Sequence, residues 1–123
     1  VTTQMTPQKQ LTAVTATHAA TDTPFHGYEI HIGNTDGPDR ARPFAHVAGA
    51  AEGAVRAAGR IAGSYLHGMF RDDAFRQAFL TALGAPAASS SYDATVEATL
   101  DALADHLEAH IDLDLLLQLA GDV

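Results

Sequence analysis

The chain has 123 residues and a formal net charge of −8, which comes from 15 acidic and seven basic side chains. The imbalance lies entirely in positions 93–123, which hold eight acidic residues and no lysine or arginine. Such an acidic segment repels phosphate backbones, so the charge argues against nucleic-acid binding. There is no cysteine to form a disulfide, and no apolar run approaches the roughly 20 residues that span a bilayer. We expect one small domain in the cytoplasm, bound neither to nucleic acid nor to a membrane.

Two strands separated by a turn are predicted at the start of the chain. Positions 1–5 and 11–18 have the composition of strands, and in the second of them successive side chains alternate between two faces. Positions 7–10, with the sequence Pro-Gln-Lys-Gln, have the composition of a turn between them.

The next predicted strand, Gly-Tyr-Glu-Ile-His-Ile-Gly at positions 27–33, alternates between apolar and polar side chains. Tyr28, Ile30 and Ile32 share one face, and Glu29 and His31 share the other. If the apolar face is buried, the polar face presents a carboxylate beside an imidazole, a pair that can bind or orient a group. A half-exposed strand with a plain polar outer face explains the same pattern.

Positions 34–43 have the local signals of a loop, among them Asp-Gly-Pro-Asp at positions 36–39. Arg40 and Arg42 lie inside this loop. They either meet a carboxylate-bearing substrate or another part of an enzyme, or they are only solvated.

A hairpin is predicted over positions 52–66, with its turn at positions 57–59. It leads into the octapeptide Gly-Ser-Tyr-Leu-His-Gly-Met-Phe at positions 63–70, where Gly68 breaks the alternation directly after His67. A histidine at the end of a strand is well placed to act as a positioned acid or base. A histidine that only ends the strand is the alternative.

The chain then becomes helical. Asp72 or Asp73 can cap a helix whose apolar side chains recur at helical spacing, and Gly84 with Pro86 supplies the stop. Positions 85–91 form a linker of small residues. The apolar positions of this helix are Phe75, Phe79, Leu80 and Leu83.

A further helix opens at Asp93, and we expect its apolar stripe to pack in the core. The stripe consists of Val96, Leu100, Leu103, Leu107 and Ile111. His106 and His110 have the spacing of a two-histidine metal site, but no third ligand completes the pattern, so we expect no metal there. Positions 113–119 are unusually apolar and either pack back onto the sheet or cover other domains.

In their order, these motifs resemble the C-terminal part of the cobyric acid synthase family, the glutamine-dependent amidotransferases of cobalamin biosynthesis. The resemblance runs over positions 1–120, through the strand at 27–35, Pro43-Phe44, Gly53-Ala54-Val55, the octapeptide at 63–70 and two helices. It implies an α/β fold, the C-terminal portion of a class I glutamine amidotransferase-like (flavodoxin-like) domain. That portion is a mixed sheet with strands and a hairpin, followed by two or three C-terminal helices.

The resemblance also implies a chemistry in which a cysteine thiolate attacks the side-chain amide of glutamine. His67 matches the catalytic histidine that moves the proton. The ammonia then passes to an ATP-dependent synthetase domain that amidates carboxylates of the corrin substrate. Related enzymes that amidate other corrin carboxylates or a peptidoglycan precursor share this design, but the motif at 27–33 favours the cobyric acid branch.

This sequence has neither a cysteine nor a phosphate-binding Gly-Lys-Ser/Thr loop. We therefore expect the nucleophile half of the glutaminase domain and the ATP-binding domain to lie upstream of Val1. On this interpretation the chain binds no cofactor, ATP and Mg²⁺ act in the full-length enzyme, and the chain alone hydrolyses no glutamine. A self-sufficient, non-catalytic module for protein binding is the rival interpretation.

The residue that orients the catalytic imidazole is left open by the sequence. Many class I glutaminases carry a glutamate two residues after the histidine, but position 69 is methionine here. The resemblance is thus to the branch that works as a dyad of cysteine and histidine, or that takes a carboxylate from elsewhere. Glu29 and His31 are the candidates for orienting His67, with Tyr28 as a further candidate for orienting or binding substrate. We expect His67 to face the groove that Glu29 and His31 line; contact with glutamine, or plain strand structure, explains these two residues equally well.

Overall fold

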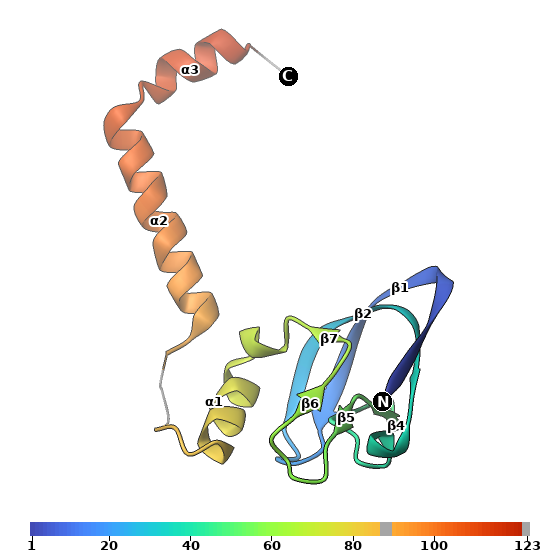
Figure 1. Ribbon diagram of the computed structural model, residues 1–123. Helices are drawn as coiled ribbons and strands as arrows, with labels where there is room; N and C mark the ends of the chain where they lie inside the picture. The colour runs from blue at the N-terminus through green and yellow to red at the C-terminus, as the bar shows by residue number, and fades with distance from the viewer. Residues whose placement is uncertain (87–89, 122–123) are drawn as a thin grey trace. The chain divides into compact units, whose positions relative to one another are not determined.

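A long antiparallel hairpin forms the centre of the sheet (Figure 1). It consists of β1 (Thr2–His18) and β2 (Pro24–Asp36). Three short strands extend it in the order β4-β3-β1-β2-β7, and a separate pair, β5 and β6, forms a two-stranded sheet. The short strands are β3 (Ala45–Val47), β4 (Ala50–Glu52), β5 (Ala54–Val55), β6 (Ala62–Gly63) and β7 (Leu66–His67).

The computed structural model describes residues 1–86 and 90–121. By its internal contacts the chain divides into two units, Val1–Ser89 and Ser90–Val123. The predicted α/β class is confirmed, with the hairpin of β5 and β6 and three helices after the sheet. We expected a mixed sheet, which contains parallel and antiparallel pairs. Among the described residues every strand pairing is antiparallel.

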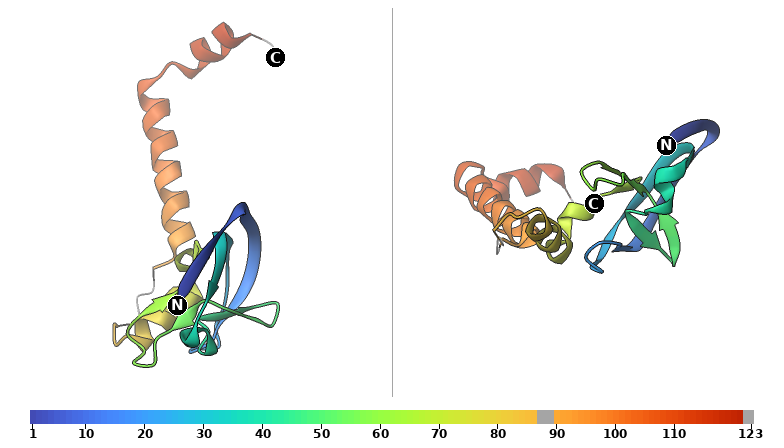
Figure 2. Two further views of the ribbon diagram at one scale, coloured as in Figure 1. Left: turned by 45° about the vertical axis from the view of Figure 1, so that its right-hand side comes forward. Right: turned by 60° about the horizontal axis from the view of Figure 1, so that its bottom comes forward.

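The turn predicted at positions 7–10 is wrong, because β1 continues through it. The register with β2 jumps between Gln4 and Lys9, so four residues of β1 lie opposite the single residue Gly33. Pro7 has no backbone N–H to donate to a neighbouring strand, and it lies within the bulge between Gln4 and Lys9. Gly33 is required here because a Cβ would lie 2.5 Å from the main-chain oxygen of Gln4. Figures 1 and 2 show the bend that results at the outer end of β1.

The core of the first unit lies where the inner ends of β1 and β2 meet α1 (Asp73–Ala82). Asp72 caps α1 as predicted, since its carboxylate accepts a hydrogen bond from the amide of Phe75 at 3.2 Å. Phe25 and Phe75 are fully buried with ring centroids 4.5 Å apart. The core consists of Ala16, Phe25, Phe44, Ala45, Leu66 and Phe75.

The two faces of β2 are the reverse of what its polarity pattern predicted. Tyr28 is 54% exposed and Ile32 43% exposed, whereas Glu29 and His31 are partly covered. The reason is that residues at odd positions of β2, among them Phe25, point to the side where the core and the chain after β2 lie. Alternation was therefore predicted correctly, but the buried side was not.

Part of the loop predicted at positions 34–43 is regular structure. β2 continues to Asp36, and a 3₁₀ turn, η1 (Pro38–Ala41), follows with proline in its first turn. A second such turn, η2 (Met69–Arg71), connects β7 to α1. The linker predicted at positions 85–91 includes residues 87–89, which lie outside the described residues.

The second unit contains α2 (Tyr92–His110) and α3 (Leu113–Ala120), and none of their described residues is buried. Core packing of the α2 stripe was therefore a wrong prediction for this unit, since Leu100, Leu103 and Leu107 are exposed. The leucines of α3 are exposed as well. No helix in the described part of the chain is both long enough and apolar enough to span a membrane.

His18 is a buried titratable group beside the core, and it makes the stability of the chain sensitive to pH. Its ring lies 4.9 Å from Phe44 and 5.3 Å from Phe75 between centroids, and burial lowers its pKa below the ordinary value. A base with a lowered folded-state pKa contributes its full stability above about pH 6.5, the unfolded value. That stability is lost as the pH falls through the folded pKa.

When the pH falls from 7.5 to 5.5, we expect the free energy of unfolding to decrease less in His18→Phe than in the wild type. The reason is that the variant has no buried imidazole at position 18 that must take up a proton on unfolding. Urea unfolding followed by circular dichroism measures this. His67→Gln is the control, since His67 is an exposed histidine of the same unit. Equal pH slopes for wild type and His18→Phe would contradict the assignment.

Candidate functional site

His67 ends β7 at the edge of the sheet, as the sequence predicted. Its residue partner on β2 is Tyr28, and Leu66 is paired with Glu29. Paired residues of antiparallel strands point to the same face, so His67 lies on the face of Tyr28. His67 is exposed, and Gly68 after it has a φ of 77°, which turns the chain out of the sheet.

The close approach of β7 to β2 depends on Gly27. A Cβ on this residue would lie 2.6 Å from the carbonyl oxygen of His67 and 3.8 Å from the amide nitrogen of Met69. Any other residue would therefore push the end of β7 away from β2. The first glycine of the 27–33 motif thus has a direct physical role in placing His67.

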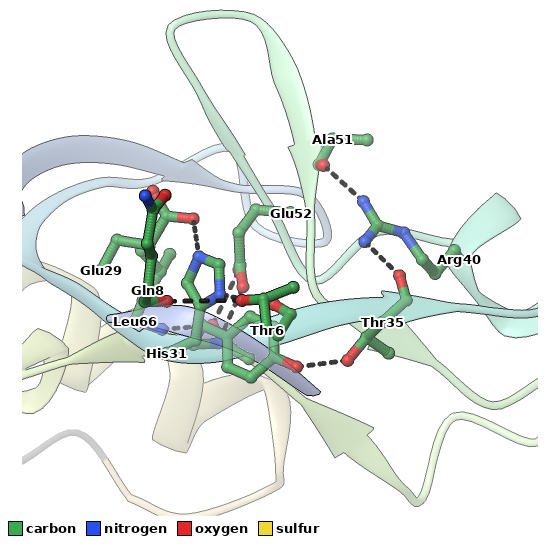
Figure 3. Close-up of polar contacts among 12 residues, drawn as sticks. Thr6, Gln8, Glu29, His31, Thr35, Arg40, Ala51, Glu52 and Leu66 are labelled. Carbon is green, nitrogen blue, oxygen red and sulfur yellow. Dashed lines mark hydrogen bonds and ion pairs between the residues drawn. The ribbon is translucent and has the colours of Figure 1, made fainter. Parts of the chain in front are cut away.

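Glu29 and His31 form a second polar group on the opposite face. The Nε2 atom of His31 lies 3.3 Å from the Oε1 atom of Glu29, and its Nδ1 atom lies 2.8 Å from the carbonyl oxygen of Gly33. The His31 ring stacks on Tyr65 with centroids 4.5 Å apart. Figure 3 shows the ring of His31 and the side chain of Glu29 pointing toward each other.

The expectation that His67 faces the groove of Glu29 and His31 is therefore wrong. Glu29 pairs with Leu66, one residue from His67, and successive residues of a strand point to opposite faces. Within this chain neither Glu29 nor His31 is placed to orient the imidazole. Of the three candidates, Tyr28 alone shares a face with His67.

Glu29 and His31 instead line a cavity of about 870 Å³ in the first unit. Its wall combines the covered face of β2 with η1 and the hairpin of β5 and β6. Further polar residues in this wall include Thr3, Thr35, Arg40, Glu52 and Tyr65. Most of them already bond to one another or to the main chain, as the hydroxyl groups of Thr35 and Tyr65 do.

The two loop arginines hold the main chain, so plain solvation is wrong for both. Arg40 donates to the carbonyl oxygens of Thr35 at 2.8 Å and Ala51 at 3.2 Å (Figure 3). Arg42 donates to the carbonyl oxygen of Val55 at 2.9 Å and pairs with Asp39. These bonds tie η1 to β4 and β5.

Glu52 is a site residue that the sequence analysis missed. It is 7% exposed, although it stands among alanines and glycines in a stretch with no obvious chemistry. Its carboxylate accepts hydrogen bonds from the hydroxyl of Ser64 and from the amide of Tyr65, both at 2.8 Å. A lone acid in a run of small apolar residues was the available signal.

His106 and His110 of α2 stack with centroids 4.2 Å apart, and the Nδ1 atom of His110 lies 2.7 Å from the carbonyl oxygen of His106. Among the described residues no three histidine, aspartate or glutamate side chains are grouped to hold a metal ion. The chemistry that the geometry offers is thus an accessible imidazole at a strand end, without a nucleophilic thiol in the chain.

The chain belongs to the family of CobB/CobQ-like glutamine amidotransferase domains, whose model matches residues 1–75. The resemblance noted in the sequence is thereby confirmed.

Its relatives include several cobyric acid synthases. The protein of Bradyrhizobium diazoefficiens is 62% identical over 92 residues, which are 75% of this chain and 19% of the relative. That of Jannaschia sp. is 63% identical over 93 residues, or 76% and 19%. That of Azorhizobium caulinodans is 57% identical over 119 residues, or 96% and 24%. The chain thus spans a fifth to a quarter of these relatives, and no solved structure matches it.

We expect Gly27→Ala to destabilise the first unit by about 1–3 kcal/mol, because the added methyl group overlaps the carbonyl of His67. Gly63→Ala is the matched control, since a Cβ there meets nothing within 4 Å. Urea unfolding of the two variants measures the difference. Equal stability of both would show that β7 does not depend on the close approach at Gly27.

Proposed function

We propose that this chain is the histidine-bearing part of the glutaminase domain of a cobyric acid synthase. The whole enzyme hydrolyses glutamine and supplies ammonia for the ATP-dependent amidation of corrin side-chain carboxylates. The observation that carries the proposal is His67, which stands exposed at the end of β7 within the 63–70 motif. The similarity to cobyric acid synthases over most of the chain supports it.

In this proposal His67 takes the proton of a cysteine thiol, and the thiolate attacks the side-chain carbonyl carbon of glutamine. The imidazolium then gives that proton to the departing ammonia, leaving a glutamyl thioester that water hydrolyses. Since the sequence contains no cysteine, the thiol comes from another part of the enzyme. The chain alone is therefore inactive toward glutamine.

We assign the remaining candidates different roles. Tyr28 lies beside His67 on the same face and borders the reacting groups. On the face of β2 that carries His67, no carboxylate of β2 lies near the imidazole. We therefore propose that the thiol and His67 work as a dyad within the glutaminase site. Glu29 and His31 act away from that site, as lining of the cavity.

ATP and Mg²⁺ belong to the synthetase domain of the whole enzyme in this proposal. Among the described residues no three acidic or histidine side chains are grouped to hold a metal ion. The sequence also lacks a phosphate-binding Gly-Lys-Ser/Thr loop.

The thiol-bearing part of the enzyme packs on the open face of the β1–β2 hairpin. Leu11 pairs with Ile30 and Ala13 pairs with Tyr28, so these apolar residues share the face of His67. Leu11 is 62% exposed, which is unusual for a leucine in a central strand. The relatives have some four times as much sequence outside this segment, and the nucleophile must reach His67 from this side.

We expect His67→Ala to lower glutamine-dependent amidation by about 10²- to 10⁴-fold, the usual contribution of a positioned acid and base. The test uses a chimaera in which this chain replaces the aligned segment of the Azorhizobium caulinodans relative. Amidation with free ammonium salt should be unaffected, because that reaction needs no glutaminase.

His46→Asn is the control, since this histidine lies on β3, which β1 and β2 separate from β7 in the sheet. Full glutaminase activity of the His67→Ala chimaera would refute the proposed role. Glutamine hydrolysis by the isolated chain would refute the need for an external thiol. Indifference of every activity to His67 would instead favour a module for protein binding.

We expect Ile32→Asn to weaken the association of this chain with a separately produced remainder of the Azorhizobium caulinodans relative. The polar amide of asparagine would be buried at the proposed contact without a hydrogen-bond partner. Leu83→Asn is the matched control, because Leu83 is 69% exposed at the end of α1. Titration calorimetry measures the affinity, and equal affinities for both variants would place the contact elsewhere.

A further inference from the structure

The segment that carries His67 is held from one side by a buried carboxylate. Glu52 lies at the end of β4 and is 7% exposed. Its Oε1 atom accepts from the amide of Tyr65, and its Oε2 atom accepts from the hydroxyl of Ser64, each at 2.8 Å. The Ser64 hydroxyl oxygen in turn accepts from the amide of Leu66 at 3.0 Å. One carboxylate therefore satisfies, directly or through Ser64, two successive amides before His67.

The same segment is held from the other side by β2. The amide of Ile30 donates to the carbonyl oxygen of Tyr65 at 2.9 Å, and Leu66 and His67 pair with Glu29 and Tyr28. β7 is only two residues long, so ladder bonds alone fix it weakly. Glu52 supplies the remaining anchors from β4.

Glu52 is itself well fixed. The amide of Phe44 donates to its carbonyl oxygen at 2.9 Å, and Glu52 pairs with Ala45 in the sheet. Phe44 and Ala45 belong to the core. A buried carboxylate is costly unless it is hydrogen-bonded, and here both oxygens are. The core therefore determines where the carboxylate stands, and the carboxylate determines where the amides of Tyr65 and Leu66 stand.

We infer that Glu52 is a positioning residue for His67, acting through the backbone of residues 64–66. This inference rests on the proposed function. Glu52 does not touch the imidazole, because its contacts are with the chain before β7. Its effect is to hold the strand end so that the imidazole meets the thiol in a reactive geometry, where a misplacement of about 1 Å lowers a rate as much as 10²-fold.

The experiment compares Glu52→Ala, Glu52→Gln and His67→Ala in the chimaeric enzyme defined above. We expect Glu52→Ala to lower kcat for glutamine hydrolysis by about 10- to 100-fold, with KM for glutamine and the ammonium-dependent amidation rate unchanged. Glu52→Gln should recover most of kcat, because its amide oxygen still accepts from Tyr65 and its NH₂ group still reaches Ser64. Asp39→Asn is the control, an acid of the same cavity that bonds to Arg42 instead.

A second measurement separates positioning from loss of folding. In the chain itself, hydrogen exchange of the Tyr65 and Leu66 amides should be faster in Glu52→Ala than in Asp39→Asn, with exchange of the core amides unchanged. Ser64→Ala, which removes the link between Glu52 and Leu66 alone, should give a smaller fall in kcat than Glu52→Ala. Ser64→Ala therefore tests the positioning role if Glu52→Ala does not fold.

The outcomes differ for the two proposals. An active His67→Ala enzyme would overturn the proposed function, whatever Glu52 does. An inactive His67→Ala enzyme together with unchanged kcat in Glu52→Ala and Ser64→Ala would overturn the positioning role alone. If Glu52→Ala and Ser64→Ala each lost glutamine-dependent and ammonium-dependent activity to the same extent, Glu52 would only support folding.

Discussion

The pairing of Leu66 and His67 with Glu29 and Tyr28 is the constraint on which the candidate site depends. Because side chains alternate between faces, this register sends Leu66 into the core and His67 to the open side. A slip of one residue would bury the imidazole and expose the leucine. Leu66 is therefore a core residue that also fixes the face on which His67 lies. A shift of the register by one residue would expose Leu66 and lose the free energy of its burial.

The first unit thus has two chemically distinct faces. On one side the polar groups of β2 bond to residues from η1 and from the chain before β7 and line a cavity. On the other side, apolar residues of β1 and β2 are exposed around an imidazole. A surface of this kind is typical of a part of a protein whose packing partner is elsewhere. The polar side is internally satisfied, and the apolar side is where further polypeptide would gain free energy by binding.

Local signals in the sequence predicted the local features correctly. The Asp72 cap, the stop of α1 near Gly84 and Pro86, the hairpin of β5 and β6, and the strand end at His67 each depend on a few neighbouring residues. The errors that affect the site involve partners distant in the chain. Which face of β2 is covered is decided by residues beyond position 36, and Glu52 gains its role only because β4 lies near Ser64 and Tyr65. The α2 stripe has helical spacing, but spacing cannot supply a surface to cover it.

The bulge opposite Gly33 also affects how the chain tolerates insertions and deletions. Residues 5–8 make no ladder pairs with β2, so the loss or gain of one residue there changes the size of the bulge and leaves the pairing from Lys9 onward intact. The same change between positions 10 and 17 would turn every later side chain of β1 to the other face. Ala16 would then leave the core and the partners of Leu11 and Ala13 would change. Length variation among homologous chains should therefore concentrate at the bulge and be absent from the inner part of the hairpin.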